Sequence, residues 1–324
     1  MHADPLFEDK TLPMLVSQSR RGASQVEDFI DWVEMNQETL DDWVHRAGAV
    51  LIRGFAINDA ELFYRVCSAI RGDLLDDIGA EVPRNPVRDR VFSASDYPGN
   101  IEVPLHNELC YSGISPERVF LGCLQPSGGG ETRLADGRQM HAAMRKEVRR
   151  RFEDLGVIYH RHLPERDNAN ATLGCWQDVF SSEDRDDVEL RLVEWEMKYE
   201  WTETGLHIDS WHPGVLQHLA TGELCWHNQA DRWHREMPGS INAIAGIAGR
   251  ENKAAGTDDP GCHVTYGDGS DITLADLLHV REVARACEVT FAMEKGDLLI
   301  IDNVSALNGR NPFTGKRNIV VSMA

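Results

Sequence analysis

The feature that most limits the fold of this chain is a series of short β-type runs in its second half. The runs are rich in β-branched and apolar residues, and turns such as Glu294-Lys295-Gly296-Asp297 and Thr314-Gly315-Lys316 separate them. They cover residues 193–201, 215–218, 224–227, 290–293, 298–302 and 317–323, and a helical pattern over residues 274–286 interrupts them. Many short strands with a few covering helices predict a β-sandwich or a jelly-roll barrel.

The first half of the chain mixes helical and β-type patterns. We predict helices over residues 24–47, from a cap at Asn58-Asp59 to about Arg71, and over residues 136–154. Strands are predicted over residues 48–55, 91–95, 101–109 and 118–124. No internal repeat or low-complexity linker divides the 324 residues. We therefore expect one domain over residues 1–324, mainly β with flanking helices.

The composition argues against several classes of partner. A net charge of −20 disfavours nucleic acid and an anionic membrane surface, because both select clustered lysine and arginine. No apolar run approaches the roughly 18 to 20 residues of a membrane-spanning helix. The N-terminus has no signal-peptide pattern, and the seven cysteines are scattered without a C-x-x-C pair. We expect a cytoplasmic protein without a disulfide framework, and a homo-oligomer is left open.

A histidine and a glutamate follow one predicted strand in the stretch Leu105-His106-Asn107-Glu108. Residues two apart on a strand point to the same face, so His106 and Glu108 can supply two arms of a 2-His-1-carboxylate iron site. The spacing itself is weak, because His-x-Asp or His-x-Glu occurs four times in the chain. Only this copy ends a predicted strand and precedes a second strand and a glycine turn. A surface His/Glu pair is the alternative.

The end of the chain supplies further polar residues beside buried strands. The apolar run over residues 298–302 is followed by Leu307-Asn308-Gly309-Arg310, and Arg317 opens the last β-type run. An arginine that points into a barrel needs an anion, and a carboxylate fits its planar fork. A structural ion pair with an internal aspartate or glutamate is the alternative for Arg317.

These residues together resemble a known family. The chain is similar to the taurine dioxygenase-like superfamily of Fe(II)/2-oxoglutarate-dependent oxygenases, and it looks closest to the branch with syringomycin-biosynthesis hydroxylases and clavaminate-synthase-like enzymes. The resemblance covers nearly the whole chain, including Gly48-Ala49-Val50-Leu51-Ile52-Arg53-Gly54-Phe55, Leu105-His106-Asn107-Glu108, Gly129-Gly130-Glu131-Thr132 and the stretch from Gly296-Asp297 to Arg317. It implies a double-stranded β-helix, or jelly roll.

The resemblance also implies the cofactors and the residues that hold them. His106 and Glu108 match iron ligands, and Thr132 and Arg317 match the residues that bind 2-oxoglutarate. Dioxygen and 2-oxoglutarate would then be consumed while a C–H bond of the substrate is oxidised, most simply by hydroxylation, with desaturation or ring closure as alternatives. The substrate is expected to be a small polar molecule, an amino acid or its derivative, free or tethered to a carrier protein.

Three further residues are expected near the substrate. Glu102 shares a strand face with His106 by the period of two, and its carboxylate suits an ammonium or guanidinium group. Arg310 suits a carboxylate, and Trp226 suits an apolar wall. The alternatives are a solvent-facing carboxylate for Glu102, a structural ion pair for Arg310 and a core position for Trp226.

The chain departs from the family at Asn308, where relatives have the second iron-binding histidine. An amide oxygen is a harder ligand than imidazole, so the substitution weakens the expected site. Asn308 can bind the metal directly or through a water, His227 can replace the missing histidine, or the residue is altered from its natural identity. The remaining alternative is a pseudo-oxygenase that binds a ligand or partner without catalysis.

Overall fold

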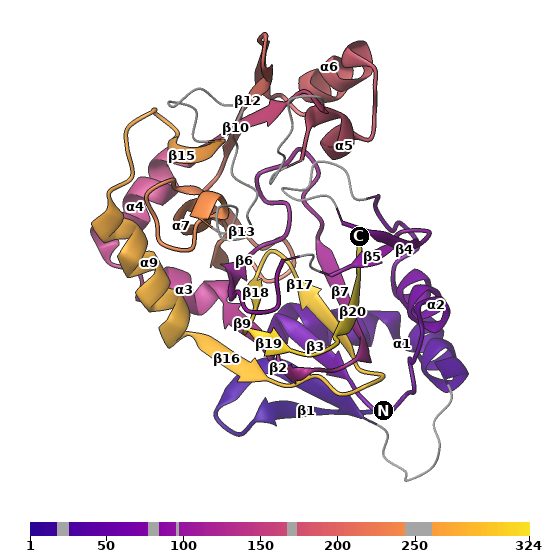
Figure 1. Cartoon of the computed structure of the whole chain (residues 1–324). Helices are drawn as coiled ribbons and strands as arrows, with labels where there is room; N and C mark the ends of the chain where they lie inside the picture. Colours follow the sequence, from indigo (N-terminus) through magenta and orange to yellow (C-terminus); the bar gives the residue numbers. More distant parts are fainter. Residues whose placement is uncertain (18–25, 77–83, 95–96, 167–173, 244–260) are drawn as a thin grey trace.

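The computed structural model describes residues 1–17, 26–76, 84–94, 97–166, 174–243 and 261–324 (Figure 1). Its helices are α1 (Val26–Ala47), α2 (Ala60–Ile70), α3 (Gly137–Ala143), α4 (Lys146–Leu155), α5 (Trp176–Phe180), α6 (Arg185–Glu194), α7 (Ala230–Trp233) and α9 (Leu274–Ala286). Its first strands are β1 (His2–Phe7), β2 (Lys10–Ser17), β3 (Ala49–Ile52), β4 (Pro86–Arg88), β5 (Val91–Ser93), β6 (Val103–His106), β7 (Arg118–Gln125), β8 (Gly128–Gly129), β9 (Thr132–Asp136) and β10 (Val157–Pro164). The remaining strands are β11 (Lys198–Trp201), β12 (Gly205–His212), β13 (Val215–Gln217), β14 (Leu224–Trp226), β15 (Cys262–Tyr266), β16 (Glu288–Phe291), β17 (Leu298–Asp302), β18 (Ala306–Arg310), β19 (Phe313–Thr314) and β20 (Asn318–Met323).

The largest sheet has eight strands in the order β1-β2-β3-β17-β7-β20-β5-β4. Its central strand β17 is apolar on both faces: Leu298 and Ile300 pack toward helices α1 and α2, and Leu299 and Ile301 pack into the opposite core. The continuous apolar run seen in the sequence follows from this burial on both sides. Figure 1 shows α1 and α2 covering the outer face of this sheet.

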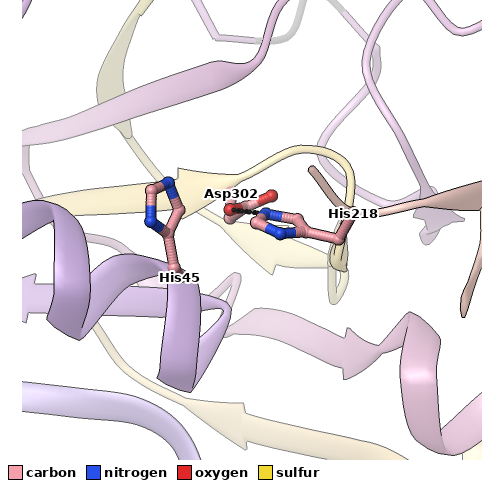
Figure 2. Close-up of side chains that lie close together, drawn as sticks. All are labelled: His45, His218 and Asp302. Atoms are coloured by element: carbon pink, nitrogen blue, oxygen red, sulfur yellow. Dashed lines mark hydrogen bonds and ion pairs between the residues drawn. The ribbon is translucent and has the colours of Figure 1, made fainter. Parts of the chain in front are cut away.

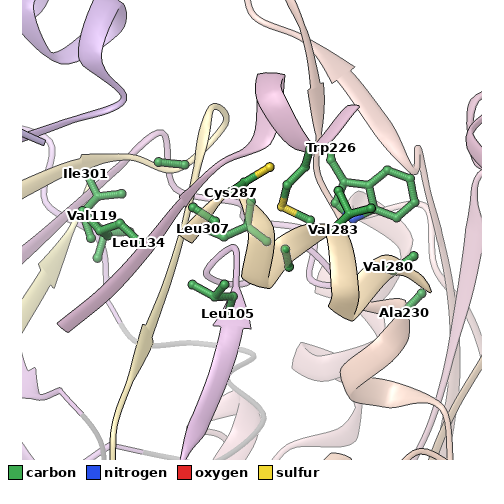
Figure 3. Packing of buried hydrophobic residues seen from close by; sticks show 14 of the residues in the cluster. Leu105, Val119, Leu134, Trp226, Ala230, Val280, Val283, Cys287, Ile301 and Leu307 are labelled. Atoms are coloured by element: carbon green, nitrogen blue, oxygen red, sulfur yellow. The ribbon is translucent and has the colours of Figure 1, made fainter. Parts of the chain in front are cut away.

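The second sheet has four strands in the order β16-β9-β18-β6. Its apolar residues share one buried cluster with those of the large sheet, and helix α9 covers its other side (Figure 3). Two packed sheets flanked by helices confirm the predicted jelly-roll architecture. Within the residues that the structure describes, the two sheets do not join into one closed barrel.

A third sheet, β11-β12-β10-β15, extends the molecule on the side of α5 and α6 (Figure 1). Strands β10, β12 and β15 were not predicted from the sequence, and neither was the β1–β2 hairpin, which begins at His2. No helix in the described ranges combines the length and the apolar character needed to span a bilayer.

The helix predicted over residues 136–154 is wrong as a single element. It is divided into α3 and α4 because Met144 and Arg145 adopt extended ψ angles of 138° and 135°. The backbone N–H of Arg145 donates to Nε2 of His279 on α9, at 3.0 Å, instead of continuing the helix. A tertiary contact therefore decides this boundary, and the local sequence carries no breaker there.

The predicted strand over residues 193–201 is also partly wrong. Its beginning belongs to α6, which starts behind the N-cap Asp184, and only Lys198–Trp201 form a strand. Glu196 separates the two elements with a φ of 55°. Two other predicted elements extend beyond the described residues. These parts are residues 24–25 of the first helix and Ser95 of the strand over residues 91–95.

Candidate active site

The register of the four-stranded sheet brings the predicted site residues together. β18 lies between β9 and β6, so that Asn308 is the direct neighbour of His106 on one side, and Arg310 is the direct neighbour of Thr132 on the other. Arg317 precedes β20 in the facing sheet and reaches the same cavity. The polar residues that line this cavity are Arg84, Tyr97, His106, Glu108, Tyr111, Thr132, Gln229, Arg232, Asn308, Arg310 and Arg317.

His106 is oriented by its own strand. Its Nδ1 lies 2.8 Å from the carbonyl oxygen of Pro104, and because a carbonyl only accepts, the ring proton is on Nδ1. The lone pair of Nε2 is then directed toward the cavity, 3.3 Å from Oε1 of Glu108. A backbone carbonyl that fixes the tautomer in this way is typical of metal-binding histidines.

Glu108 lies in the turn just after β6, so the strand ends sooner than the sequence predicts. Oε2 of Glu108 accepts from Nη2 of Arg84 at 2.8 Å, which leaves Oε1 on the side of His106. Burial would raise the pKa of the Glu108 carboxyl, but the charge and the hydrogen bond of Arg84 oppose it, and the pKa is held well below its usual range. The carboxylate is therefore ionised and ready to bind a cation.

Asn303 fixes the backbone that carries this carboxylate. Its Oδ1 accepts from the N–H of Glu108 at 2.7 Å, and its Nδ2 donates to the carbonyl of Glu108 at 2.9 Å. The side chain of Asn107 donates in return to the carbonyl of Asn303 at 2.7 Å. These buried bonds tie the end of β6 to the turn before β18, so the two ligand-bearing strands hold one fixed spacing.

Asn308 contributes an amide at the position where the sequence resemblance predicts imidazole. Its Nδ2 donates to the carbonyl of His106 at 3.3 Å, and within the described ranges its Oδ1 has no hydrogen-bond partner. His227 is buried, and its ring lies against the backbone of Asn303 and Val304 rather than in the cavity. Among the described lining residues His106 is the only histidine, so the structure does not bring His227 in as a replacement.

Arg310 and Arg317 form a cationic wall of the cavity. Within the described residues neither guanidinium has a carboxylate within ion-pair distance, and both lie near the ring of Phe313, at 4.7 and 5.5 Å from its centroid. Burial lowers the pKa of each to about 10, and for Arg317 the charge of Arg310 adds to the effect. Such arginines are suited to bind anions that enter from solution.

Two predicted substrate residues do not lie at this cavity. Glu102 precedes β6, pairs with Arg133 and faces a separate hollow beside α9. Trp226 faces that hollow too and is buried against Phe152, with 4.7 Å between ring centroids (Figure 3). The period-of-two argument failed for Glu102 because the pairing of β6 with β18 has a register shift between Val103 and His106, so that Pro104 lies at the same hollow as Glu102.

Sequence reasoning missed five polar residues of the cavity: Arg84, Tyr97, Tyr111, Gln229 and Arg232. Arg232 on α7 donates from Nη1 to Oε1 of Gln229 at 2.9 Å and from Nη2 to the hydroxyl of Tyr97 at 3.1 Å. None of the five lies within a predicted strand at a ligand-like spacing, so no local signal could have found them.

A second group of possible ligands lies at the C-terminal end of β17. His45 on α1, His218 after β13 and Asp302 at the end of β17 place one ligand atom each within 4.8 Å of one another (Figure 2). Nε2 of His45, both ring nitrogens of His218 and both carboxylate oxygens of Asp302 already have hydrogen-bond partners. Arg118 donates to Nε2 of His45 and, at 3.1 Å, to Oδ2 of Asp302.

The remaining atoms of this second group are also engaged. Nδ1 of His218 accepts from the N–H of Thr221 at 3.2 Å, so its Nε2 carries the proton and donates to Oδ2 of Asp302 at 2.8 Å. Oδ1 of Asp302 accepts from the N–H groups of Val304 and Ser305, each at 3.1 Å. The group therefore anchors the turn that carries Asn303 and leaves no lone pair facing a cavity.

Comparison with known proteins agrees with this geometry. Residues 15–323 match the family described as taurine catabolism dioxygenase TauD, TfdA family. The chain is 30% identical to a clavaminate synthase-like protein of Arabidopsis thaliana over 98% of this chain and 94% of that protein. It is 25% identical to the dapdiamide synthesis protein DdaC of Enterobacter agglomerans over 98% of this chain and 93% of that protein.

Solved structures share the fold. PvcB of Pseudomonas aeruginosa has a TM-score of 0.54 at 16% identity, covering 99% of this chain and 90% of that one. PvcB is also described as an Fe, alpha-ketoglutarate dependent oxygenase from an isonitrile synthetic pathway. AAD-2, solved with Mn(II) and N-oxalylglycine, has a TM-score of 0.55 at 12% identity and covers 100% of this chain and 97% of that one. The chain thus belongs to the TauD, TfdA dioxygenase family, a family of Fe(II)/2-oxoglutarate-dependent oxygenases.

Proposed function

We propose that this chain oxidises an unactivated C–H bond of a small polar molecule, derived from an amino acid, in a biosynthetic pathway. The observation that carries the proposal is the pair of ligand atoms at the cavity: Nε2 of His106 and Oε1 of Glu108 lie 3.3 Å apart, with Asn308 on the adjacent strand. His106 and Glu108 would hold the metal from one side, and Oδ1 of Asn308 from the other, directly or through a water. Fe(II) with 2-oxoglutarate and dioxygen supplies the oxidant in such enzymes.

The donor set fits a divalent metal. It combines a histidine of fixed tautomer, an ionised carboxylate and an amide oxygen on adjoining strands. Arg84 has two effects: its charge keeps Glu108 ionised, and its hydrogen bond to Oε2 leaves Oε1 as the atom that faces His106. Asn303 holds the Glu108 backbone in place while ligands enter and leave.

Arg317 and Thr132 would bind the distal carboxylate of 2-oxoglutarate. The support is that Arg317 has no carboxylate partner among the described residues and that Thr132 is buried in the wall of the same cavity. A guanidinium and a hydroxyl together give a carboxylate one charged and one neutral donor.

Anaerobic titration with Fe(II) and 2-oxoglutarate tests the proposal. A visible metal-to-ligand charge-transfer band that requires both, followed by succinate formation in air, is the expected result. The matched control is Arg317→Gln, which should weaken 2-oxoglutarate binding without removing the metal ligands. If no band and no succinate appear at saturating Fe(II), the oxygenase proposal fails.

A non-catalytic role on the same scaffold is the second candidate. Two observations favour it: the strand neighbour of His106 is the amide Asn308 rather than a histidine, and Arg84 places a competing cation on Glu108. For a pseudo-oxygenase, calorimetry would detect binding of 2-oxoglutarate or a substrate, yet no succinate would form. The syringomycin-like branch, a carrier-tethered substrate, a homo-oligomer and a cytoplasmic location stay predictions of the sequence.

A further inference from the structure

The peptide unit between Asn107 and Glu108 is held at both of its polar ends by side chains. Its N–H, that of Glu108, donates to Oδ1 of Asn303 at 2.7 Å, and its carbonyl, that of Asn107, accepts from Nε2 of Gln229 at 2.6 Å. All four residues are buried. A peptide plane that is bonded at both ends in a buried setting does not rotate without breaking a hydrogen bond. His106 comes just before this plane and the side chain of Glu108 just after it, so the plane sets how the two candidate metal ligands lie relative to each other.

The backbone just beyond Glu108 has an unfavourable conformation. Leu109 has a φ of 51°, in the left-handed region that residues with a Cβ disfavour. The turn therefore does not keep its shape through local preference, and the bonds from Asn303 and Gln229 stabilise it.

Gln229 connects this turn to the wall of the cavity formed by α7. Its Nε2 donates to the Asn107 carbonyl, and its Oε1 accepts from Nη1 of Arg232 at 2.9 Å. Because a carbonyl only accepts and a guanidinium only donates, a single orientation of the amide satisfies both partners. Arg232 lines the cavity, so a ligand that contacts this arginine acts on one end of the Gln229 side chain.

The main chain of Gln229 is fixed as well. Its N–H donates to the hydroxyl of Tyr159 on β10 at 2.8 Å, and its carbonyl accepts from the N–H groups of Arg232 and Trp233, each at 3.0 Å. Since the backbone is held, the side chain sets the spacing between α7 and the turn rather than following the turn when it moves.

On the basis of the proposed function, we propose that Gln229 is a positioning residue for the metal site: it fixes the peptide unit between His106 and Glu108 and links that unit to Arg232 on the cavity wall. A substrate that contacts Arg232 would thereby change how firmly the two ligand-bearing residues are held. Gln229 acts through the Asn107 carbonyl, and the role requires no contact between Gln229 and the metal.

Hydrogen exchange of the metal-free protein tests the first part of the proposal without any cofactor. Gln229→Met keeps a buried side chain of similar size but removes the amide, so the Glu108 N–H should exchange about 10-fold faster, as measured by NMR. Gln229→Asn keeps an amide on a side chain one methylene shorter, and it should also speed this exchange. The matched control is Gln177→Met, which makes the same change at a buried glutamine on α5 and should leave the exchange of the Glu108 N–H unchanged.

Fe(II) affinity tests whether the held turn matters to the metal ligands. Equilibrium dialysis under argon with 2-oxoglutarate present should give about 10-fold weaker Fe(II) binding in Gln229→Met, at the lower end of the effect of residues behind a metal ligand. Gln177→Met should bind Fe(II) as the unmodified protein does.

A double-mutant cycle tests the link to Arg232. Arg232→Met removes the donor to Oε1 of Gln229, and we expect faster exchange of the Glu108 N–H when Gln229 is present. In the Gln229→Met background the same change should add nothing to this exchange, because the link is already broken.

Several results would overturn the inference. Unchanged exchange of the Glu108 N–H in both Gln229→Met and Gln229→Asn would show that Gln229 does not hold the turn. Faster exchange with unchanged Fe(II) affinity would show that the held turn does not position the ligands. Equal effects of Arg232→Met in the two backgrounds, or no effect in either, would remove the link to the cavity wall. If the unmodified protein binds no Fe(II), the proposed function fails, and the exchange measurements still decide whether Gln229 holds the turn.

Discussion

The group formed by His106, Glu108 and Asn308 and the group formed by His45, His218 and Asp302 use similar side chains in opposite ways. The second has the complete set of two histidines and one carboxylate (Figure 2), yet Nε2 of His45 and all polar side-chain atoms of His218 and Asp302 form hydrogen bonds. The first lacks a histidine but directs Nε2 of His106 and Oε1 of Glu108 at a cavity. Composition alone therefore does not identify a metal site, and the partner of each lone pair has to be followed.

The largest effect should come from breaking the second group. Asp302→Ala leaves His218 buried without its carboxylate and Arg118 with only Asp41, at 3.7 Å, and loss of one partner of a buried pair costs about 3–5 kcal/mol of unfolding free energy. Urea denaturation measures the loss. Asp209→Ala is the control, because its carboxylate pairs with His160 at the surface and should cost less than about 1 kcal/mol. Equal losses in the two variants would refute the anchoring role.

The next effect concerns the first group. His106→Ala should lower Fe(II) affinity by more than about 100-fold, since even residues behind a metal ligand contribute about 10- to 100-fold. Equilibrium dialysis with Fe(II) under argon measures it, and the melting temperature should change little. His45→Ala, which removes a histidine from the second group, should retain the metal. Loss of Fe(II) binding in His45→Ala but not in His106→Ala would instead assign the metal to the second group.

A smaller change should come from placing histidine where the sequence resemblance predicts the second imidazole ligand. Asn308→His adds an imidazole beside His106, and we expect Fe(II) affinity to rise by at least about 10-fold, because imidazole is the better Fe(II) ligand. Asn308→Ala is the matched control. If alanine and asparagine give the same affinity, the amide of Asn308 takes no part in binding the metal.

The smallest predicted effect concerns His227, which belongs to neither group. Burial lowers its pKa to about 4, so the unfolded chain binds a proton on this histidine between pH 6.5 and 4 while the folded chain does not. Its contribution to stability is therefore complete at neutral pH and is lost as the pH falls through this window, by on the order of 1 kcal/mol per pKa unit. His227→Phe should give a flatter stability curve across the window. An unchanged slope, measured by denaturation from pH 7 to 4.5, would argue against a buried neutral ring.

Much of the fold could be predicted where burial left a clear pattern. The prediction of β17 was confirmed because both of its faces are buried and give a continuous apolar run. The helix predicted over residues 274–286 coincides with α9. β10, with the sequence Val-Ile-Tyr-His-Arg-His-Leu-Pro, was missed because its polar residues give no simple alternation. Its order comes from pairing with β12 and β15, which are distant in the sequence.

The residues of the candidate site also differ in whether the local sequence predicts them. His106, Glu108, Thr132, Asn308 and Arg317 were all expected from their places beside strands, and the structure puts them around one cavity. Arg84 lies just before β4, and Arg232 lies on the four-residue helix α7. The positions of both depend on the packing of the whole molecule. The partners of Asp302 were equally out of reach, because they come from three separate elements.

The place of β20 in the large sheet has a consequence for how the protein is made. β20 fills the gap between β7 and β5, and it is the last strand in the sequence. While the ribosome is still adding it, β7 has an unpaired backbone edge, and such edges invite association with other chains. Newly made molecules should therefore depend on chaperones until β20 has left the ribosome, and slower translation of this strand would prolong the exposure of the β7 edge.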